Sequence, residues 1–182
     1  MIEIAGFLIV SAGLIYFSRA SLRRPASHGF YRFFAWECML ILLLLNVRVW
    51  FDQPLSINQI VSWVLLVISL LLVLPGVNLL HRKGKVSDQK RDEPLLAFEK
   101  TTVLVTDGLY RYIRHPLYSS LLFLNWGIFF KDPSAPGTLL ALAATAFLFF
   151  TARAEERENV SYFGEAYREY MGRTKMFVPY VL

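Results

Sequence analysis

Residues 104–118 read LVTDGLYRYIRHPLY, a polar, aromatic and basic segment that leads into the apolar run LLFLNWGIFF at residues 121–130. Gly108 permits a tight turn, and Pro116 suits the first turn of a helix, where its missing N–H costs nothing. Backbone donors at such a helix start can face an anionic group, such as a ligand carboxylate. The segment is also typical of a plain basic loop at a membrane entry, anchored by its tyrosines.

The composition around this segment indicates an integral membrane protein. Of the 182 residues 55% are apolar and only 18% are charged, and the apolar residues are gathered into long runs. We expect membrane lipids as partners, and neither nucleic acid nor a metal ion. The single cysteine, Cys38, lacks the Cys/His neighbours of a zinc site, so we expect it to be a small buried apolar residue.

Five apolar runs predict an all-α, polytopic fold with about five transmembrane helices. The first run is interpreted as a membrane helix rather than a signal peptide, because no basic region precedes it and SRASLRRP follows it. The last two runs flank the turn KDPSAP and predict an antiparallel helical hairpin. The runs are residues 2–17, 30–51, 57–80, 117–130 and 137–150.

Charged residues interrupt the second run. Arg32 and Arg48 lie near its ends, where we expect their side chains to reach the membrane interfaces. Glu37 lies deeper, where a carboxylate is costly and commonly faces a cavity or a partner. Two interpretations of Glu37 stay open: it lines an active-site cavity, or it is a protonated or Arg-paired structural residue.

Two polar stretches complete the chain. After the third run comes a charged connector at residues 81–102, and residues 98–105 are expected to be extended and to fold back over a ligand. The C-terminal region predicts an amphipathic helix at the membrane surface. Its apolar residues are Val160, Phe163, Tyr167, Tyr170 and Met171, and its polar residues are Arg157, Glu158, Glu165, Arg168 and Glu169.

Basic residues concentrate after the first run, after the third run and in the C-terminal region. Because cytoplasmic loops carry an excess of Lys and Arg, this bias predicts an outside N-terminus and a cytoplasmic C-terminus. The connector and the C-terminal tail are therefore expected on the same, cytoplasmic side.

The order of motifs resembles one family of membrane enzymes. The pattern LVT-x-G-x-Y-R-Y-x-R-H-P-x-Y, two apolar segments, the pair Glu155–Glu156 and then FGEAYREYMGRTKMFVP is similar to the isoprenylcysteine carboxyl methyltransferases and the wider group that includes the phospholipid N-methyltransferases. The resemblance covers roughly residues 100–180. It implies S-adenosylmethionine-dependent methyl transfer to a lipophilic, membrane-borne acceptor, which is a lipid or a small molecule with a reacting carboxylate, amine or thiol.

The resemblance also implies one domain over residues 1–182 with a cytoplasmic cofactor pocket. Residues 1–80 would form three spans, residues 81–116 the connector with the cofactor motif, residues 117–150 the hairpin, and residues 151–182 a tail that encloses the cofactor. The cofactor-binding candidates are Thr102, Val103, Leu104, Val105, Gly108, Tyr110, His115, Pro116, Leu117, Tyr118, Glu155 and Glu156.

Individual roles follow from the chemistry of the cofactor. S-Adenosylmethionine carries an ammonium group, for which Glu155 and Glu156 can supply the acidic group, and Glu155 is expected to pair with it. From the residues alone, an acidic pair at a membrane helix end is also typical of a solvated cap. His115 is expected to hold the cofactor or to cap a backbone group, and no metal ligand set is expected.

One position departs from the family pattern. In the carboxyl methyltransferase branch, an Arg four residues before the first Glu is thought to hold the substrate carboxylate, and here that position is Thr151. Arg153, two residues later on a different helix face, is the candidate catalytic residue. The departure leaves the identity of the acceptor open.

Two other classes of function stay open. NADPH-dependent membrane sterol reductases share an RHP-x-Y-like segment, but they are normally larger, and the pair Glu155–Glu156 argues against them. A non-enzymatic membrane scaffold or small transporter is the other alternative, although the sequence lacks an inverted repeat. Binding of a cofactor would separate both classes from a methyltransferase.

Overall fold

The computed structural model describes residues 2–84 and 102–179, and their regular structure is helical apart from one isolated β-bridge. This confirms the predicted all-α class. The α-helices are α1 (Ile2–Leu22), α2 (His28–Asn46), α3 (Ile57–Lys83), α4 (Pro116–Phe129), α5 (Ala135–Phe163) and α6 (Glu165–Arg173). Two short 3-10 helices are η1 (Val47–Val49) and η3 (Gly108–Arg111).

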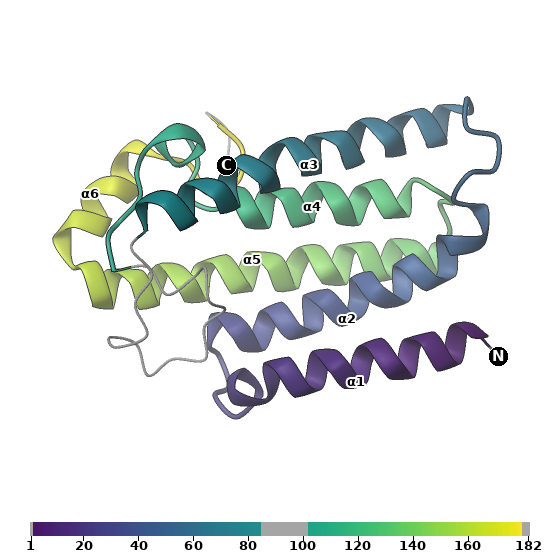
Figure 1. Cartoon of the computed structure of the whole chain (residues 1–182), viewed down its shortest axis with the longest axis horizontal. Coiled ribbons are helices and arrows are strands. Elements are labelled where there is room, and N and C mark those ends of the chain that lie inside the picture. The colour runs from purple at the N-terminus through teal and green to yellow at the C-terminus, as the bar shows by residue number, and fades with distance from the viewer. Residues whose placement is uncertain (1, 85–101, 180–182) are drawn as a thin grey trace.

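The helices α1 to α5 lie side by side, and successive helices run in opposite directions (Figure 1). The turn between α1 and α2, the segment before α4, and α6 therefore gather at one end of the bundle, which we call the α6 end. The N-terminus and the turns that follow η1 and α4 lie at the opposite end. This arrangement brings the motif-bearing segments together.

Within residues 2–84 and 102–179, four helices are long and apolar enough to cross a membrane: α1, α2 with η1, α3 and α5. A multi-pass membrane protein is thereby confirmed. The expected fourth run corresponds to α4, which has 14 residues, fewer than the ~20 that a spanning helix needs. It packs against α3 and α5.

The fifth helix extends much further than its apolar run predicted. Instead of ending near residue 150, α5 continues to Phe163 and includes the acidic pair Glu155–Glu156. Gly164, with φ of 62°, then breaks the helix before α6 begins. The prediction of one surface amphipathic helix was therefore wrong in its extent, since Val160 and Phe163 belong to α5.

The tyrosines of α6 also differ from the surface-anchor prediction. Tyr167 and Tyr170 are each 2% exposed, because they turn toward the protein interior rather than along a membrane surface. Residues that follow α6 are packed in as well, and Met176 and Phe177 join a hydrophobic core cluster with Ala35, Tyr118, Leu148 and Ala152. The C-terminal region is thus part of the fold.

Three further expectations have clear outcomes. The hydroxyl of Ser11 on α1 donates a 2.9 Å hydrogen bond to Glu37 Oε1 on α2, which favours the structural interpretation of Glu37. Cys38 is half-buried rather than buried. Of the segment expected to be extended, residues 98–101 lie outside the described residues, and residues 102–105 have no helical structure.

Candidate active site

A cavity of about 300 Å³ lies at the α6 end of the bundle. Its walls come from α2, α3, α4, α5, α6 and the segment before α4. The volume is at the lower end of the range for small-molecule sites, about 300 to 1,000 Å³. The cavity is therefore the candidate active site.

The structure brings most of the sequence-predicted residues to this cavity. The candidates that line it are Leu104, Val105, Tyr110, His115, Pro116, Leu117, Tyr118 and Glu155. Thr102, Val103, Gly108, Arg153 and Glu156 are not among the residues that line it. Gly108 has a backbone role instead, since its φ of 58° begins η3 and forms the tight turn that the sequence predicted.

The other residues of the cavity walls were not among the individually predicted site residues. They consist of Arg32 and Trp36 from α2, Val73, Val77 and Leu80 from α3, Arg114, Ser120 and Leu121 around the start of α4, Asn159 and Phe163 from α5, and Tyr167 and Tyr170 from α6. In the sequence, Arg32 is conspicuous as a charged residue near the start of an apolar run. Contrary to the prediction that it reaches an interface, its side chain faces the cavity.

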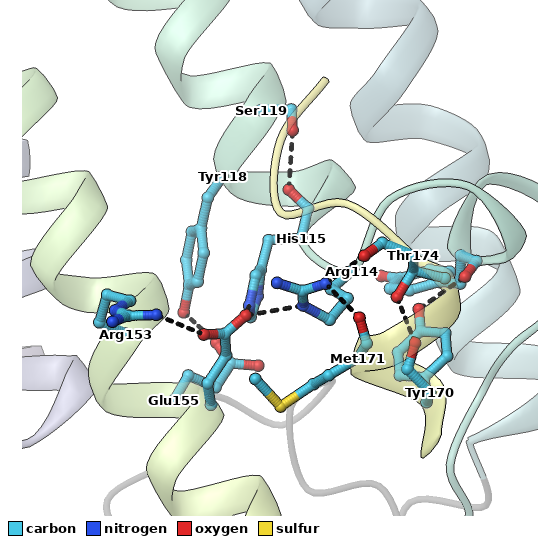
Figure 2. A network of polar contacts seen from close by, with 11 residues as sticks. Arg114, His115, Tyr118, Ser119, Arg153, Glu155, Tyr170, Met171 and Thr174 are labelled. Atoms are coloured by element: carbon cyan, nitrogen blue, oxygen red, sulfur yellow. Dashed lines mark hydrogen bonds and ion pairs between the residues drawn. The ribbon is translucent and has the colours of Figure 1, made fainter. Parts of the chain in front are cut away.

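Glu155 is held in place by a neighbouring tyrosine. The hydroxyl of Tyr118 donates a 2.5 Å hydrogen bond to Glu155 Oε2. The Tyr118 ring is stacked on the His115 ring, with centroids 5.4 Å apart and an interplanar angle of 24°. Figure 2 shows both rings lying on the same side of the Glu155 side chain. The carboxylate that faces the cavity therefore has a fixed position.

Glu156, the next residue, belongs to a buried polar network behind the cavity wall. It is 3% exposed, and Arg114 Nε donates a 2.7 Å hydrogen bond to its Oε1. His115 Nε2 lies 3.6 Å from the same oxygen, and Arg153 Nη1 lies 3.7 Å from Oε2. The structure thus gives the two acidic residues different surroundings: Glu155 faces the cavity, and Glu156 binds the motif segment to α5.

Arg114 extends this network to the C-terminal region (Figure 2). Its Nη1 donates hydrogen bonds to the backbone carbonyls of Met171, at 3.2 Å, and Thr174. The side chain of Arg114 is only 10% exposed, so its charge is compensated by a carboxylate and two carbonyls rather than by water. One guanidinium therefore connects α5, the motif segment and the end of α6.

The backbone after α6 pairs with the motif segment. Arg114 N donates to Lys175 O at 2.8 Å, and His115 N donates to Met176 O at 3.1 Å. These bonds flank the parallel bridge between Ile113 and Lys175. In addition, the Tyr170 hydroxyl donates a 2.6 Å hydrogen bond to the Tyr110 carbonyl. These contacts hold α6, whose Tyr167 and Tyr170 line the cavity, against the motif segment.

The two tyrosines of α6 are neutral cavity walls at physiological pH. Burial raises the pKa of Tyr167 far above its ordinary value, and the nearby Glu155 charge raises it further. Burial also raises the pKa of Tyr170, more than Arg114 and Arg173 lower it. Both phenols therefore keep their protons and can act as hydrogen-bond donors.

A contact between His28 and Glu158 joins the start of α2 to α5. Glu158 Oε1 accepts a 3.0 Å hydrogen bond from the backbone N–H of His28, and Glu158 Oε2 contacts the His28 ring at Nδ1. His28 is the first residue of α2 and is buried. Glu158 is thus not a solvated residue on a surface helix, because it fixes the start of α2 against the end of α5.

Comparisons of the sequence with known proteins found a matching family and several relatives. The family model described as phospholipid methyltransferase matches residues 57–166. The chain is 32% identical over 75 residues to methanethiol S-methyltransferase 1 of Bradyrhizobium diazoefficiens, covering 41% of this chain and 26% of that protein. It is 33% identical over 84 residues to the protein-S-isoprenylcysteine O-methyltransferase of Schizosaccharomyces pombe, covering 45% of this chain and 35% of that protein.

A third relative is the protein-S-isoprenylcysteine O-methyltransferase B of Arabidopsis thaliana, 37% identical over 81 residues, which are 43% of this chain and 40% of that protein. The chain therefore spans between about a quarter and two fifths of the length of these relatives. No solved structure matches the chain.

Proposed function

Because this chain belongs to the phospholipid methyltransferase family of membrane proteins, we propose that it transfers the methyl group of S-adenosylmethionine to a lipophilic acceptor in the membrane. The observation that carries the proposal is the fixed carboxylate of Glu155 in the wall of the cavity at the α6 end. The names of the relatives indicate different acceptors, a thiol in one group and an isoprenylcysteine carboxyl group in the other.

The residues around the cavity fit this cofactor. Glu155 would pair with its ammonium group, because a carboxylate held by Tyr118 in a partly desolvated site favours a cationic partner. Apolar side chains of Val73, Val77 and Leu80 would form the slot for its adenine. The phenol of Tyr167 adds a neutral hydrogen-bonding group, whereas the proton of Tyr170 is already donated to the Tyr110 carbonyl.

When bound, S-adenosylmethionine supplies a methyl group that its sulfonium already activates for displacement. The work of the protein is then to align the acceptor and to exclude water. The tail after α6 supports the second task, because its backbone pairs with residues 113–115 and its Tyr170 binds the Tyr110 carbonyl. The buried pair Arg114–Glu156 holds this closure in place.

His115 would be a positioning residue. Its buried ring stacks on Tyr118 and lies 3.6 Å from Glu156, so it supports the phenol that orients Glu155. Arg153 has a side chain that is 56% exposed and lies 3.7 Å from Glu156, outside the cavity lining. The proposal therefore gives Arg153 a place in the supporting network and no contact with the acceptor.

We also propose that the α6 end faces the cytoplasm and that the N-terminus lies outside. The described basic residues at the α6 end, Arg23, Arg24, Arg82, Lys83, Arg111, Arg157, Arg168, Arg173 and Lys175, support this orientation. S-Adenosylmethionine is a charged, water-soluble molecule, so its site is expected to open toward the aqueous compartment that contains it.

The direct test is binding of S-adenosylhomocysteine, the product form of the cofactor, to the detergent-solubilised protein by calorimetry. We expect saturable binding at one site. Transfer of a labelled methyl group from S-adenosylmethionine to a panel of lipophilic acids, amines and thiols would then identify the acceptor. Absence of binding by protein that circular dichroism shows to be helical would contradict the proposal.

A further inference from the structure

We infer that His115 is the catalytic base of the methyl transfer: it takes the proton from a protic acceptor, one that carries hydrogen on its reacting atom. This inference rests on the proposed function and goes beyond it, because a positioning residue holds its neighbours and moves no proton. The fixed ring of His115, its neighbour Glu156 and its place in the cavity wall carry the inference.

The backbone of His115 is fixed by the tail and by α4. Its N–H donates a 3.1 Å hydrogen bond to the Met176 carbonyl, and its own carbonyl accepts hydrogen bonds from the N–H and the hydroxyl of Ser119, at 2.9 and 3.0 Å. The ring is in contact with two aromatic rings, those of Tyr118 and Phe177, at centroid distances of 5.4 and 6.3 Å. The buried imidazole is therefore held in one orientation.

One nitrogen of this ring lies beside a carboxylate. His115 Nε2 is buried, has no hydrogen-bond partner among residues 2–84 and 102–179, and lies 3.6 Å from Glu156 Oε1. A carboxylate favours the tautomer in which the nearer ring nitrogen carries the proton, because that nitrogen then presents a positive hydrogen to it. This assigns the proton to Nε2 and leaves the lone pair on Nδ1.

The lone pair on Nδ1 is directed to the other side of the ring. Glu156 belongs to the network behind the cavity wall, whereas His115 is one of the residues that line the cavity. Because Nε2 is turned to Glu156, the Nδ1 edge of the ring is the one that an acceptor in the cavity can approach. His115 thus has the position and the lone pair that a base needs.

Other polar groups in the described cavity wall are less suited to accept a proton. Glu155 already accepts a hydrogen bond from Tyr118 and is proposed to pair with an ammonium group. Tyr167 and Tyr170 keep their protons, because burial raises the pKa of each phenol. The arginines of the wall are cations with no lone pair to offer. His115 contributes an imidazole, the side chain that most readily exchanges protons near neutral pH.

The transfer of the proton balances. The reacting atom of the acceptor gives its proton to His115 Nδ1 and uses the electron pair of the broken bond to bind the methyl carbon. The bond from that carbon to the sulfonium sulfur breaks, and the sulfur keeps both electrons. The imidazolium that forms lies near the Glu156 carboxylate, whose charge stabilises it. Arg114 shares that carboxylate, so the stabilisation is partial and the proton can pass to water once the product has left.

The first measurement needs no methyl transfer. Benzenethiol is added to the protein saturated with S-adenosylhomocysteine in a neutral detergent, and the near-ultraviolet absorbance of its thiolate is followed with pH. We expect the bound thiol to ionise at a pH about one unit or more below that of free benzenethiol in the same detergent, because the imidazolium of His115 stabilises the thiolate. His115→Gln keeps an amide that can reach Glu156 but has no basic nitrogen, so the shift should be lost.

The second measurement compares two acceptors of similar size, 4-nitrobenzenethiol, which is ionised in water at neutral pH, and phenylmethanethiol, which keeps its proton. His115→Gln should lower kcat/KM for phenylmethanethiol by roughly a hundredfold or more, the usual contribution of a general base, and should change the value for 4-nitrobenzenethiol far less. A merely structural role of His115 would lower both values by the same factor. The ratio of the two values therefore reports the base itself.

Tyr118→Phe is the matched control, because it keeps the aromatic ring beside His115 and removes only the hydroxyl that holds Glu155. It should lower the affinity for S-adenosylhomocysteine and leave the ratio of the two thiols at the parental value. Binding of S-adenosylhomocysteine also reports whether each variant is folded. If His115→Gln does not fold, His115→Asn takes its place, and if that variant fails as well, the ionisation of the thiol by the parent decides.

The outcomes separate the two proposals. If the parent binds S-adenosylhomocysteine but benzenethiol ionises in the complex as it does in free solution, the inference about His115 is wrong and the proposed function stands. The inference is also wrong if the parent methylates neither thiol, or if His115→Gln lowers kcat/KM for both thiols by the same factor. If the folded parent does not bind S-adenosylhomocysteine, the proposed function itself fails.

Discussion

The hydroxyl of Tyr118 at the start of α4 donates a hydrogen bond of 2.5 Å to Oε2 of Glu155 near the end of α5. Tyr118 is itself fixed, because it is buried in a core cluster and stacked on His115. The Glu155 carboxylate is thus oriented before any ligand arrives, which reduces the entropic cost of binding. The first prediction concerns this carboxylate.

Glu155→Gln preserves the shape of the side chain and removes its charge. We expect the affinity for S-adenosylhomocysteine to fall by about ten- to a hundred-fold, because an ammonium group loses a charged partner. Calorimetry on the detergent-solubilised variant measures the change. Glu169→Gln, on the exposed face of α6, is the matched control and should bind like the parent. Equal binding by both variants would place the ammonium elsewhere.

Arg114→Met removes the cation of the buried pair with Glu156. The buried Glu156 carboxylate then has fewer positive groups to balance its charge. Loss of one partner of a buried pair typically costs about 3–5 kcal/mol, so we expect a lower unfolding temperature and faster proteolysis of the tail after Arg173. The double variant Arg114→Met/Glu156→Leu should recover part of the loss, since no buried charge remains.

The exposed pair Arg168–Glu165 on α6 is the control for that experiment. Arg168→Met should leave the unfolding temperature unchanged, because exposed pairs contribute little. If Arg114→Met behaves in the same way, the network around Glu156 does not hold the tail.

Alkaline titration tests the buried phenols of α6. The pKa of Tyr167 is raised in the folded protein above the value of about 10 for an unfolded chain. The contribution of its neutral form to stability is therefore complete below pH ~10 and is lost as the pH rises further. We expect Tyr167→Phe to shift alkaline unfolding, followed by circular dichroism, to higher pH.

Tyr162→Phe is the control for the titration, because Tyr162 is more than a third exposed. Its removal should not change the pH of unfolding. A shift of equal size in both variants would show that burial of Tyr167 is not the cause.

Orientation in the membrane can be tested by labelling in a Cys38→Ala background. Glu169→Cys lies on α6, and Asp132→Cys lies in the turn between α4 and α5 at the opposite end of the bundle. With a membrane-impermeant maleimide on intact cells, we expect labelling of Asp132→Cys alone. The reverse result would invert the proposed topology, and labelling of both positions would contradict a membrane-spanning bundle.

The sequence predicted the helices well where apolar runs were long. The start of α3 at Ile57 was predicted at the correct residue, and α4 begins at Pro116, one residue earlier than expected. The end of α5 was missed, because the amphipathic pattern continues through Gly164 without a change of period. Only the positive φ of that glycine marks the break, and a sequence does not display a φ value.

Charged residues were the hardest to place. Lys131 resembles a surface cation in the sequence, yet it is 4% exposed. Its ammonium lies 3.3 Å from the centroid of the Trp63 ring and 2.9 Å from Gln59 Oε1. The partner Gln59 is 72 residues away along the chain. Such contacts depend on which helices become neighbours, which local patterns do not encode.

The dependence on helix packing also explains which site residues the sequence predicted and which it did not. The motif segment and Glu155 were predicted by their residue types and order, and they do line the cavity. The walls from α2 and α3 consist largely of apolar residues, which any membrane helix carries. Their contribution became visible only when the packing of α2 on α5 and of α3 on α4 was known.

The contact between His28 and Glu158 limits which helices could be exchanged with those of another protein. It fastens α2, which precedes the matched region, to the end of α5, 130 residues later. A chimaera that joined residues 57–182 to the N-terminal helices of another protein would keep every motif and still lose the wall that carries Arg32 and Trp36. The first two helices are therefore poor candidates for exchange as a generic membrane anchor, and swapping them is expected to change the shape of the cavity.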